Sequence, residues 1–393
     1  MNKNILAGEV QEYIHQHLNG DVFTIAMAKS PFPEVSSREL ANQIAAKQKS
    51  AKKLPTWYHR DLIYYPALLS IEQCSSESTA AYKSGLTIGQ TLIDLTGGFG
   101  VDSLFFARKL QSVSHCEINP ELSEIAAYNA KVLQQSNIDF LALDGIAYLQ
   151  ENPVHFDNIY IDPARRSIAG KVFMLKDCTP NVVGHLDLLL SKSKRIIIKT
   201  APLLDLSAGL KELKKVSEIH VVSVKNECKE LLWILENEPS DKVRIVCTTL
   251  NEQQKIFSFY KGEEDHEAEI PEEDLQQYLY EPDTALLKGG AFNLIASRYD
   301  LQKLHSQTQL YTSSEILKEF PGRRFKINGL LAPADLKKEK DLRGNVIARN
   351  YRDKAEQLVK KYKIKPDQKR FLIFTQSKKQ GYLVIDASIE QHY

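Results

Sequence analysis

The chain has 393 residues, of which 26% are charged and 43% are hydrophobic, and its formal net charge is +1. This balance is that of a globular protein, and the length suffices for two or three domains of ordinary size. No apolar run approaches the roughly 20 residues that span a bilayer, and the N-terminus lacks the apolar core of a signal peptide. We therefore expect a cytoplasmic protein with no membrane partner. The five cysteines are scattered without a CxxC pair, so we expect neither a metal site nor a disulfide framework.

The first 84 residues are expected to be helical. Apolar side chains recur every three or four positions in AGEVQEYIHQHL (7–18) and in SRELANQIAAKQ (37–48), which is the spacing of an amphipathic helix. Ser36 and Ser37 stand at the start of the second segment and are candidate N-caps. The pattern predicts an N-terminal helical domain over residues 1–84.

From about residue 90, short apolar runs alternate with amphipathic segments. This pattern predicts an α/β domain with a mostly parallel sheet over residues 85–240. The expected strands are TLIDLT, SVSHCEI, IDFLALD, FDNIYIDP, RIIIKT, EIHVVSV and ELLWILE. Only a short turn separates the last two, so these two can pair antiparallel.

Residues 241–393 are expected to form a separate C-terminal α+β domain with a ferredoxin-like fold. KVRIVCTTL and KIFSFYKG predict a hairpin, and a single helix is expected over TALLKGGAFNLIASRY (284–299). A further helix is expected around residues 351–363, followed by strands at RFLIFT and GYLVIDA.

Charge is distributed unevenly along the chain. Residues 47–60 hold five Lys or Arg and no acid, and residues 323–370 hold sixteen bases against six acids, whereas residues 251–283 hold eleven acids against two bases. The two basic segments together, the first with Trp57 and Tyr58 interleaved, favour a polyanionic partner such as nucleic acid. For either segment alone, a solvated helix face is the alternative.

The strand that ends at Asp94 runs into a glycine-rich loop. In an open α/β sheet a ligand lies beyond the carboxyl ends of the strands, where glycines let the backbone approach it. The loop matches neither GxxxxGK[ST] nor GxGxxG, so phosphate cradling of a nucleoside triphosphate is disfavoured and a dinucleotide is not indicated. A tight structural turn is the alternative to a cofactor site. The candidate cofactor-binding residues of the loop are Asp94, Thr96, Gly97, Gly98, Gly100 and Asp102.

Acids also end the two neighbouring strands. Glu117 closes the second strand, where its carboxylate could accept both ribose hydroxyls of a nucleoside. Asp144 ends the third strand, where its oxygen could accept the amino group of adenine. With the adjacent Ile118 and Gly145, these residues complete the predicted cofactor site.

The stretch YIDPARRS (160–167) ends the fourth strand. Because proline keeps the preceding residue extended, Asp162 should be held at the strand tip beside the cofactor. Arg165 and Arg166 could neutralise a phosphate or form a bidentate ion pair with a strand-end acid. Lys199, at the end of the next strand, could contact the substrate or be solvated.

The order DxTGGxG, strand-end Glu, strand-end Asp and DPxR resembles a class I S-adenosylmethionine-dependent methyltransferase over residues 85–240. The last loop is similar to the [D/N/S]PP[Y/F] motif of amino-group methyltransferases, in which the acid or amide and the proline carbonyl hold an exocyclic amine. The resemblance implies a Rossmann-like fold, S-adenosylmethionine as cofactor, and Asp162, Pro163 and Arg165 as catalytic residues. Ala164 and Arg165 replace the second proline and the aromatic residue of the motif, which leaves the target atom open.

The whole chain resembles a group of bacterial methyltransferase-like proteins with a THUMP-like C-terminal domain. The stretches EQCSSESTAAYKSGL, DPARR, KGGAFNLIASRYDLQKLHSQTQLYTS and FPGRRFKINGLL carry this resemblance. It implies structured RNA, tRNA or rRNA, as substrate. Arg166 and Lys199 are our candidate substrate-binding residues, from their positions at the strand ends.

Within RNA methylation, carbon-5 methylation of pyrimidines needs a nucleophilic cysteine, and the loop KTAPLLD (199–205) has none. Methylation of a base nitrogen, with guanine N2 first, is therefore the preferred reaction. Two alternatives stay open: a non-catalytic RNA-binding protein that keeps the methyltransferase fold, and a nucleotide-dependent oxidoreductase, for which we find no hydride-transfer residue.

Overall fold

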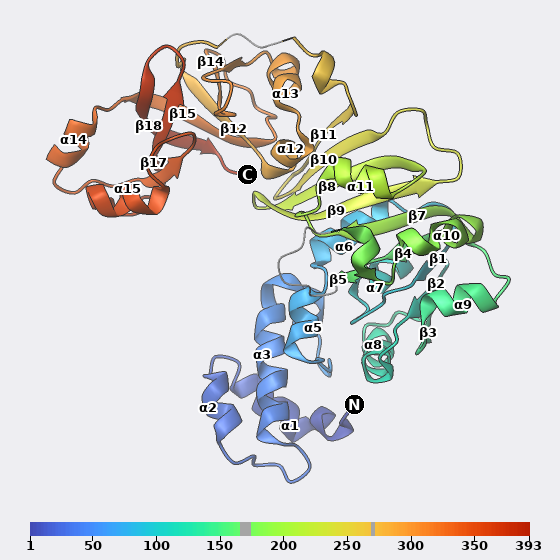
Figure 1. Cartoon of the computed structure of the whole chain (residues 1–393). Coiled ribbons are helices and arrows are strands. Elements are labelled where there is room, and N and C mark those ends of the chain that lie inside the picture. The colour runs from blue at the N-terminus through green and yellow to red at the C-terminus, as the bar shows by residue number, and fades with distance from the viewer. Residues whose placement is uncertain (166–173, 269–271) are drawn as a thin grey trace. The chain divides into compact units, whose positions relative to one another are not determined.

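The computed structural model describes residues 1–165, 174–268 and 272–393. The chain divides into two compact units (Figure 1). The first unit comprises Met1–Ser217 and Leu232–Ser240, and the second comprises Glu218–Leu231 and Asp241–Tyr393. No helix among the described residues is long and apolar enough to cross a membrane. Arg166, a predicted substrate-binding residue, lies outside the described residues.

The N-terminal part of the first unit is helical, as predicted. Its α-helices are α1 (Gly8–Gln16), α2 (Val22–Met27), α3 (Ser37–Lys53), α4 (Pro55–His59), α5 (Leu68–Gln73) and α6 (Glu77–Gly85). Ser36 caps α3 in a reciprocal capping box: its hydroxyl accepts from the backbone N–H of Glu39, and the Glu39 carboxylate accepts from the backbone N–H of Ser36 at 2.8 Å. The N-cap prediction at Ser36 is confirmed.

These helices do not form a core of their own. Ile44 of α3 and Trp57 of α4 belong to the same cluster of buried apolar side chains as Phe106 and Val113 of the α/β part. Trp57, only 1% exposed, contacts the ring of Phe99 in the glycine-rich loop, with ring centroids 6.3 Å apart. Packing therefore shows no break at residue 84, and the division into domains at residues 84 and 240 stays a prediction.

The α/β part alternates strands and helices. Its strands are β1 (Thr91–Asp94), β2 (Ser112–Cys116), β3 (Ile138–Leu141), β4 (Phe156–Ile161), β7 (Ser193–Thr200) and β9 (Glu227–Glu236), in the sheet order β9-β7-β4-β1-β2-β3. The pairs β1–β2, β2–β3, β1–β4 and β4–β7 are parallel. The intervening helices are α7 (Val101–Ala107), α8 (Pro120–Val132), α9 (Gly145–Glu151), α10 (Leu186–Lys192) and α11 (Leu206–Glu212). The predicted Rossmann-like α/β fold is confirmed.

The expected antiparallel pair is a hairpin of β8 (Val216–Val224) and β9. Its two turn residues, Lys225 and Asn226, have φ angles of 51° and 59°, which is the left-handed backbone of a type I′ turn. In the second unit, β10 (Arg244–Leu250) and β11 (Gln254–Tyr260) form the other predicted hairpin, and β10 pairs in parallel with β8.

The rest of the second unit is built on a seven-stranded sheet. Its order is β13-β14-β12-β15-β18-β17-β16, with β12 (Tyr278–Pro282), β13 (Gln302–Lys303), β14 (Tyr311–Ser313), β15 (Gly322–Leu330), β16 (Asn345–Ala348), β17 (Arg370–Ser377) and β18 (Gly381–Gln391). Its α-helices are α12 (Thr284–Gly289), α13 (Phe292–Tyr299), α14 (Pro333–Lys338) and α15 (Ala355–Tyr362). The single helix expected over 284–299 is wrong, because Gly290 ends α12 with a left-handed φ of 83°.

Candidate active site

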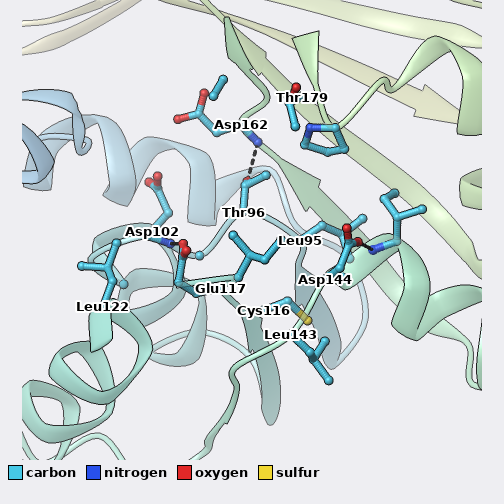
Figure 2. A pocket seen from close by; sticks show the side chains of 18 of the residues that line it. Leu95, Thr96, Asp102, Cys116, Glu117, Leu122, Leu143, Asp144, Asp162 and Thr179 are labelled. Carbon is cyan, nitrogen blue, oxygen red and sulfur yellow. Dashed lines mark hydrogen bonds between the residues drawn. The ribbon is translucent and has the colours of Figure 1, made fainter. Parts of the chain in front are cut away.

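A cavity of about 730 Å³ lies at the carboxyl ends of β1, β2, β3 and β4 (Figure 2). This volume is typical of small-molecule sites. Nine of the ten predicted cofactor-binding residues line it: Thr96, Gly97, Gly98, Gly100, Asp102, Glu117, Ile118, Asp144 and Gly145. Asp162 lines it as well. The structure thus brings predicted residues from four separate strand ends to one cavity, and their role in cofactor binding stays a prediction.

Asp94, the tenth residue, does not line the cavity. It is 1% exposed and lies behind the glycine-rich loop, where its carboxylate accepts from the backbone N–H of Thr96 at 3.0 Å and from the hydroxyl of Ser103 at 2.6 Å. Ser103 in turn lies 3.0 Å from Nδ1 of His115. Asp94 thus holds the loop in shape, and burial raises the pKa of its carboxyl group to about 7.

His115 of β2 lies directly beneath the loop. A Cβ atom at residue 97 would overlap its imidazole ring, so the residue above the ring must be glycine. Burial lowers the pKa of His115 to about 3, which keeps the ring neutral at physiological pH. The glycine at 97 therefore lets the chain pass closely over β2.

Glu117 joins the end of β2 to the glycine-rich loop. Its Oε2 accepts from the backbone N–H of Gly98 at 2.9 Å, and its Oε1 accepts from the backbone N–H of Asn119 at 2.8 Å. These two bonds fix the carboxylate at the cavity wall. The adjacent Ile118 also lines the cavity and is 73% exposed, which leaves an apolar surface beside the carboxylate.

Asp144 is the N-cap of α9. Its Oδ1 accepts from the backbone N–H groups of Ile146 at 2.8 Å and Ala147 at 3.1 Å, and the side chain is at the cavity wall (Figure 2). Gly145 is buried, and a Cβ there would lie 2.8 Å from the Leu95 side chain. This packing brings α9 close to the loop that follows β1.

Asp102 connects the cavity to the N-terminal helices. Its carboxylate accepts from the hydroxyl of Ser75 at 2.7 Å and from that of Tyr160 at 3.1 Å, and it lies 3.2 Å from the ammonium of Lys83. Lys83 has no exposed side-chain surface. The predicted cofactor-binding residue Asp102 thus also anchors the segment that follows α5.

Asp162 stands at the end of β4, as predicted. Its backbone N–H donates to the hydroxyl of Thr96 at 2.7 Å, and its Oδ2 accepts from the ammonium of Lys199 at 2.5 Å (Figure 2 shows the first bond). Lys199 does not line the cavity; its ammonium reaches the site through Asp162. Pro163 is buried, and the backbone of Arg165 belongs to the short strand β5 (Ala164–Arg165).

The comparison with known proteins identifies the family. A crystal structure described as that of a candidate methyltransferase from Porphyromonas gingivalis W83 matches 99% of this chain and 99% of that chain, at 30% sequence identity and a TM-score of 0.86. The chain belongs to this methyltransferase family. This assignment agrees with S-adenosylmethionine, the cofactor predicted from the sequence.

Two further matches are partial. The RNA methyltransferase MMOB5020 of Mycoplasma mobile, described as uncharacterized, is 33% identical over 90 residues, which is 23% of this chain and 25% of that protein. The chain thus spans about a quarter of this curated relative. A ferredoxin-like domain family matches residues 278–321, within the predicted C-terminal α+β domain. The ferredoxin-like assignment is confirmed, while the THUMP-like one stays a prediction.

The charge of the methyltransferase cavity is strongly one-sided. Four carboxylates line it, those of Asp102, Glu117, Asp144 and Asp162, and no Lys or Arg is among its described lining residues. Lys83 and Lys199 pair with two of these carboxylates, those of Asp102 and Asp162. The carboxylates of Glu117 and Asp144 remain to attract a cationic ligand and to disfavour a pyrophosphate. The methyltransferase is therefore poorly suited to a dinucleotide, which argues against the oxidoreductase alternative.

Two walls of the methyltransferase cavity were missed by sequence reasoning. One comes from the end of α5 and the residues after it, Ser70, Gln73, Cys74 and Ser75. The other comes from Ala164 and from Thr179, Pro180, Asn181 and His185, because β5 pairs antiparallel with β6 (Cys178–Thr179). The only sequence signal was the stretch EQCSSES itself, which nothing local connects to the glycine-rich loop.

Within residues 1–165, 174–268 and 272–393, no group of three or more His, Cys, Asp or Glu side chains could hold a metal ion.

Proposed function

We propose that the protein transfers a methyl group from S-adenosylmethionine to a nitrogen of a base in structured RNA, with the 2-amino group of guanine as the first candidate. One observation carries the proposal: Glu117, Asp144 and Asp162 meet the glycine-rich loop around a single cavity whose described lining holds carboxylates and no Lys or Arg. A sulfonium and an ammonium, the two cations of the donor, complement such a wall.

The residues of the cavity fit the donor. In this proposal Glu117 accepts the ribose hydroxyls, Asp144 accepts the adenine amino group, and the exposed side chain of Ile118 covers the adenine ring. The backbone at Gly97 and Gly98 lies against the rest of the donor. When bound, S-adenosylmethionine supplies a methyl group that its sulfonium sulfur already activates.

The protein's main task is then to align the accepting nitrogen with that methyl group. The carbonyl of Pro163 and Oδ1 of Asp162 are our candidates to accept the two N–H groups of the amine, since Oδ2 of Asp162 is held by Lys199. As the nitrogen gains the methyl group it loses a proton, which Oδ1 of Asp162 accepts. Lys199 keeps the carboxylate in place throughout this step.

Methylation of nitrogen, rather than of pyrimidine carbon-5, also agrees with the chemistry of the cysteines. Cys74 and Cys116 line the cavity, but burial raises their thiol pKa values to about 11 and about 12. Both remain protonated at neutral pH, and a thiol is not the nucleophile that carbon-5 methylation requires.

RNA enters the proposal from two sources: the sequence resemblance and the partial match to an RNA methyltransferase. The choice between tRNA and rRNA, and the choice of guanine N2, rest on the sequence alone.

Methyl transfer from radiolabelled S-adenosylmethionine to total bacterial RNA tests the function. We expect label in RNA that co-migrates with N2-methylguanosine after digestion, and no label with Asp162→Ala. Label on carbon-5 of a pyrimidine would refute the nitrogen chemistry. Donor binding without any transfer to RNA would favour a non-catalytic protein or a different acceptor.

A further inference from the structure

A second cavity, of about 460 Å³, lies in the second unit between the hairpin β10–β11 and α13, and we call it the cationic hollow. Four of its lining side chains are basic and one is acidic: Lys242, Arg244, Lys261, Arg298 and Glu263. His266 also lines it. The concentration of positive charge in a concave surface favours an anionic ligand.

The guanidinium groups of the cationic hollow are held in fixed positions. Arg298 donates to the carbonyl of Ser258 at 2.6 Å and to Glu263 at 2.5 Å, and its guanidinium lies 4.9 Å from the ring centre of Phe257. Arg244 donates to the hydroxyl of Ser258 at 2.9 Å and pairs with the carboxylate of Glu218 at 3.7 Å. Arginine held in this way loses little conformational entropy when it binds a phosphate.

Tyr260, the last residue of β11, adds an aromatic surface. It lines the cationic hollow and is 48% exposed, while its backbone N–H donates to Glu263 at 2.8 Å. An exposed aromatic ring among cations is the combination that binds single-stranded nucleic acid, because the ring stacks on a base while the cations contact phosphates.

The first of the two basic segments offers much less than its composition suggests. In residues 47–60, Trp57 is buried, Lys47 is buried, and the ammonium of Lys53 donates to the carbonyls of Ile71 and Glu72 at 2.9 and 2.7 Å. These side chains stabilise the helices of the first unit and are not presented to a partner.

In residues 323–370 much of the positive charge is compensated. Arg323 and Arg349 both pair with the buried Glu281, and Arg370 pairs with Glu339 and Asp386. Further ion pairs are Arg324–Glu390, Lys338–Asp335, Arg343–Asp341, Lys365–Asp341 and Lys361–Asp353. The arginines of the cationic hollow are also paired, Arg298 with Glu263 and Arg244 with Glu218. What distinguishes the hollow is therefore its concave surface and the exposed ring of Tyr260 among the cations.

We propose that the cationic hollow binds the phosphate backbone of the RNA substrate, with Tyr260 stacked on one of its bases. This inference rests on the proposed function, since the ligand is the RNA that receives the methyl group. The composition of the sequence does not point to this site, because most of the residues that line the hollow belong to the acidic stretch 251–283.

The test compares two charge-reversed double variants of the full chain that change the net charge equally. Lys242→Glu with Lys261→Glu alters the cationic hollow, whereas Lys337→Glu with Lys340→Glu alters exposed positions in the predicted segment 323–370. Binding of a fluorescently labelled RNA stem-loop with a single-stranded tail is measured as a function of salt, and donor binding by calorimetry checks that each variant is folded.

We expect the hollow variant to lose about tenfold or more in RNA affinity. The slope of log affinity against log salt concentration should fall by about two ionic contacts, and the control variant should stay close to the parent. Tyr260→Ala should weaken binding about fivefold or more, and Tyr260→Phe, which keeps the ring, should not. Equal affinities of the two double variants, or no RNA binding by the parent, would overturn the inference.

Methyl transfer to RNA separates this inference from the proposed function. If the parent methylates RNA and the hollow variant binds RNA normally, the inference is wrong and the function stands. If the parent transfers no methyl group to RNA but only the hollow variant loses RNA affinity, the binding site stands and the function is wrong.

Discussion

The ammonium of Lys199 lies 2.5 Å from Oδ2 of Asp162, which links the carboxyl end of β7 to that of β4 beside the cavity. The backbone of Asp162 is fixed as well, through its N–H bond to Thr96. The carboxylate thus has one oxygen bound within the protein, and its position is set before any substrate arrives. Such preorganisation is the main contribution that a protein can make to methyl transfer.

The first prediction concerns this pair. Asp162→Ala should bind S-adenosylmethionine nearly as well as the parent but slow methyl transfer about 100-fold or more, because alignment is lost while the donor contacts remain. Lys199→Ala should have the same sign with a smaller effect, and Lys199→Arg, which can still donate to the carboxylate, should retain more activity. Calorimetry and single-turnover transfer separate the two steps. A loss of donor affinity in Asp162→Ala would place Asp162 in the cofactor site instead.

The second prediction concerns Glu117. Glu117→Ala removes the carboxylate proposed to bind ribose, and a hydrogen bond to a charged group is worth about 1.5–3 kcal/mol. Donor affinity measured by calorimetry should therefore fall about tenfold to a hundredfold. Glu121→Ala, which changes an exposed acid in the first turn of α8, serves as the matched control and should leave the affinity unchanged. Unchanged affinity in Glu117→Ala would contradict the assignment.

The third prediction concerns the buried Lys83, which pairs with Asp102 and donates to the hydroxyl of Ser75 at 2.9 Å. Lys83→Met should lower the free energy of unfolding by about 3–5 kcal/mol, because it leaves a carboxylate without its cationic partner in a mostly buried position. Donor affinity should also fall, since Ser75 forms part of the cavity wall. Lys131→Met, on an exposed position of α8, is the control in chemical denaturation.

The fourth prediction concerns pH. The pKa of Asp94 is raised by burial from 3.8 to about 7, so the folded state retains a proton that the unfolded state releases. The stability that this proton provides is complete below pH 3.8 and is lost as the pH rises through about 7. The side chain of the Asp94→Asn variant does not titrate. Its amide can still accept a hydrogen bond from the N–H of Thr96 and donate one to the hydroxyl of Ser103.

Urea denaturation of the parent and of Asp94→Asn at several pH values measures this effect. The variant's stability relative to the parent should increase between pH 4 and pH 7, by at most about 1.4 kcal/mol per pH unit. The pKa of His115 is lowered from 6.5 to about 3, so the stability that its neutral ring provides is lost as the pH falls through that range. This loss is common to both proteins and cancels in the comparison. A difference that does not vary with pH would show that Asp94 titrates normally.

The sequence predicted which residues line the cavity where their position at the end of a strand decides where they lie. Glu117, Asp144 and Asp162 each end a parallel strand, and the ends of parallel strands meet at one edge of the sheet. Asp94 also ends a strand, yet Ser103 and His115 bury its carboxylate behind the loop. The direction of a strand-end side chain depends on the residues packed against it, which lie in other elements.

Long-range packing explains the other omissions. Ser70 and Ser75 reach the cavity because Asp102 holds their segment. The DPAR loop reaches Thr179 because Ala164 pairs with that residue across the 14 positions 165–178. Neither contact follows from local periodicity. The break at Gly290 was missed because GlyGly within an apolar helical pattern is compatible with either one helix or two.

The overlap between a Cβ at residue 97 and the ring of His115 has a consequence for how this family can diversify. The two positions cannot change independently, because an alanine at 97 fits only where the residue at 115 is already smaller. A smaller residue at 115 also removes a neighbour of Ser103. The order of the two substitutions is therefore fixed, and a lineage that reversed it would pass through a protein with a distorted cofactor loop. Relatives with another residue at 97 should accordingly carry a compensating replacement at 115.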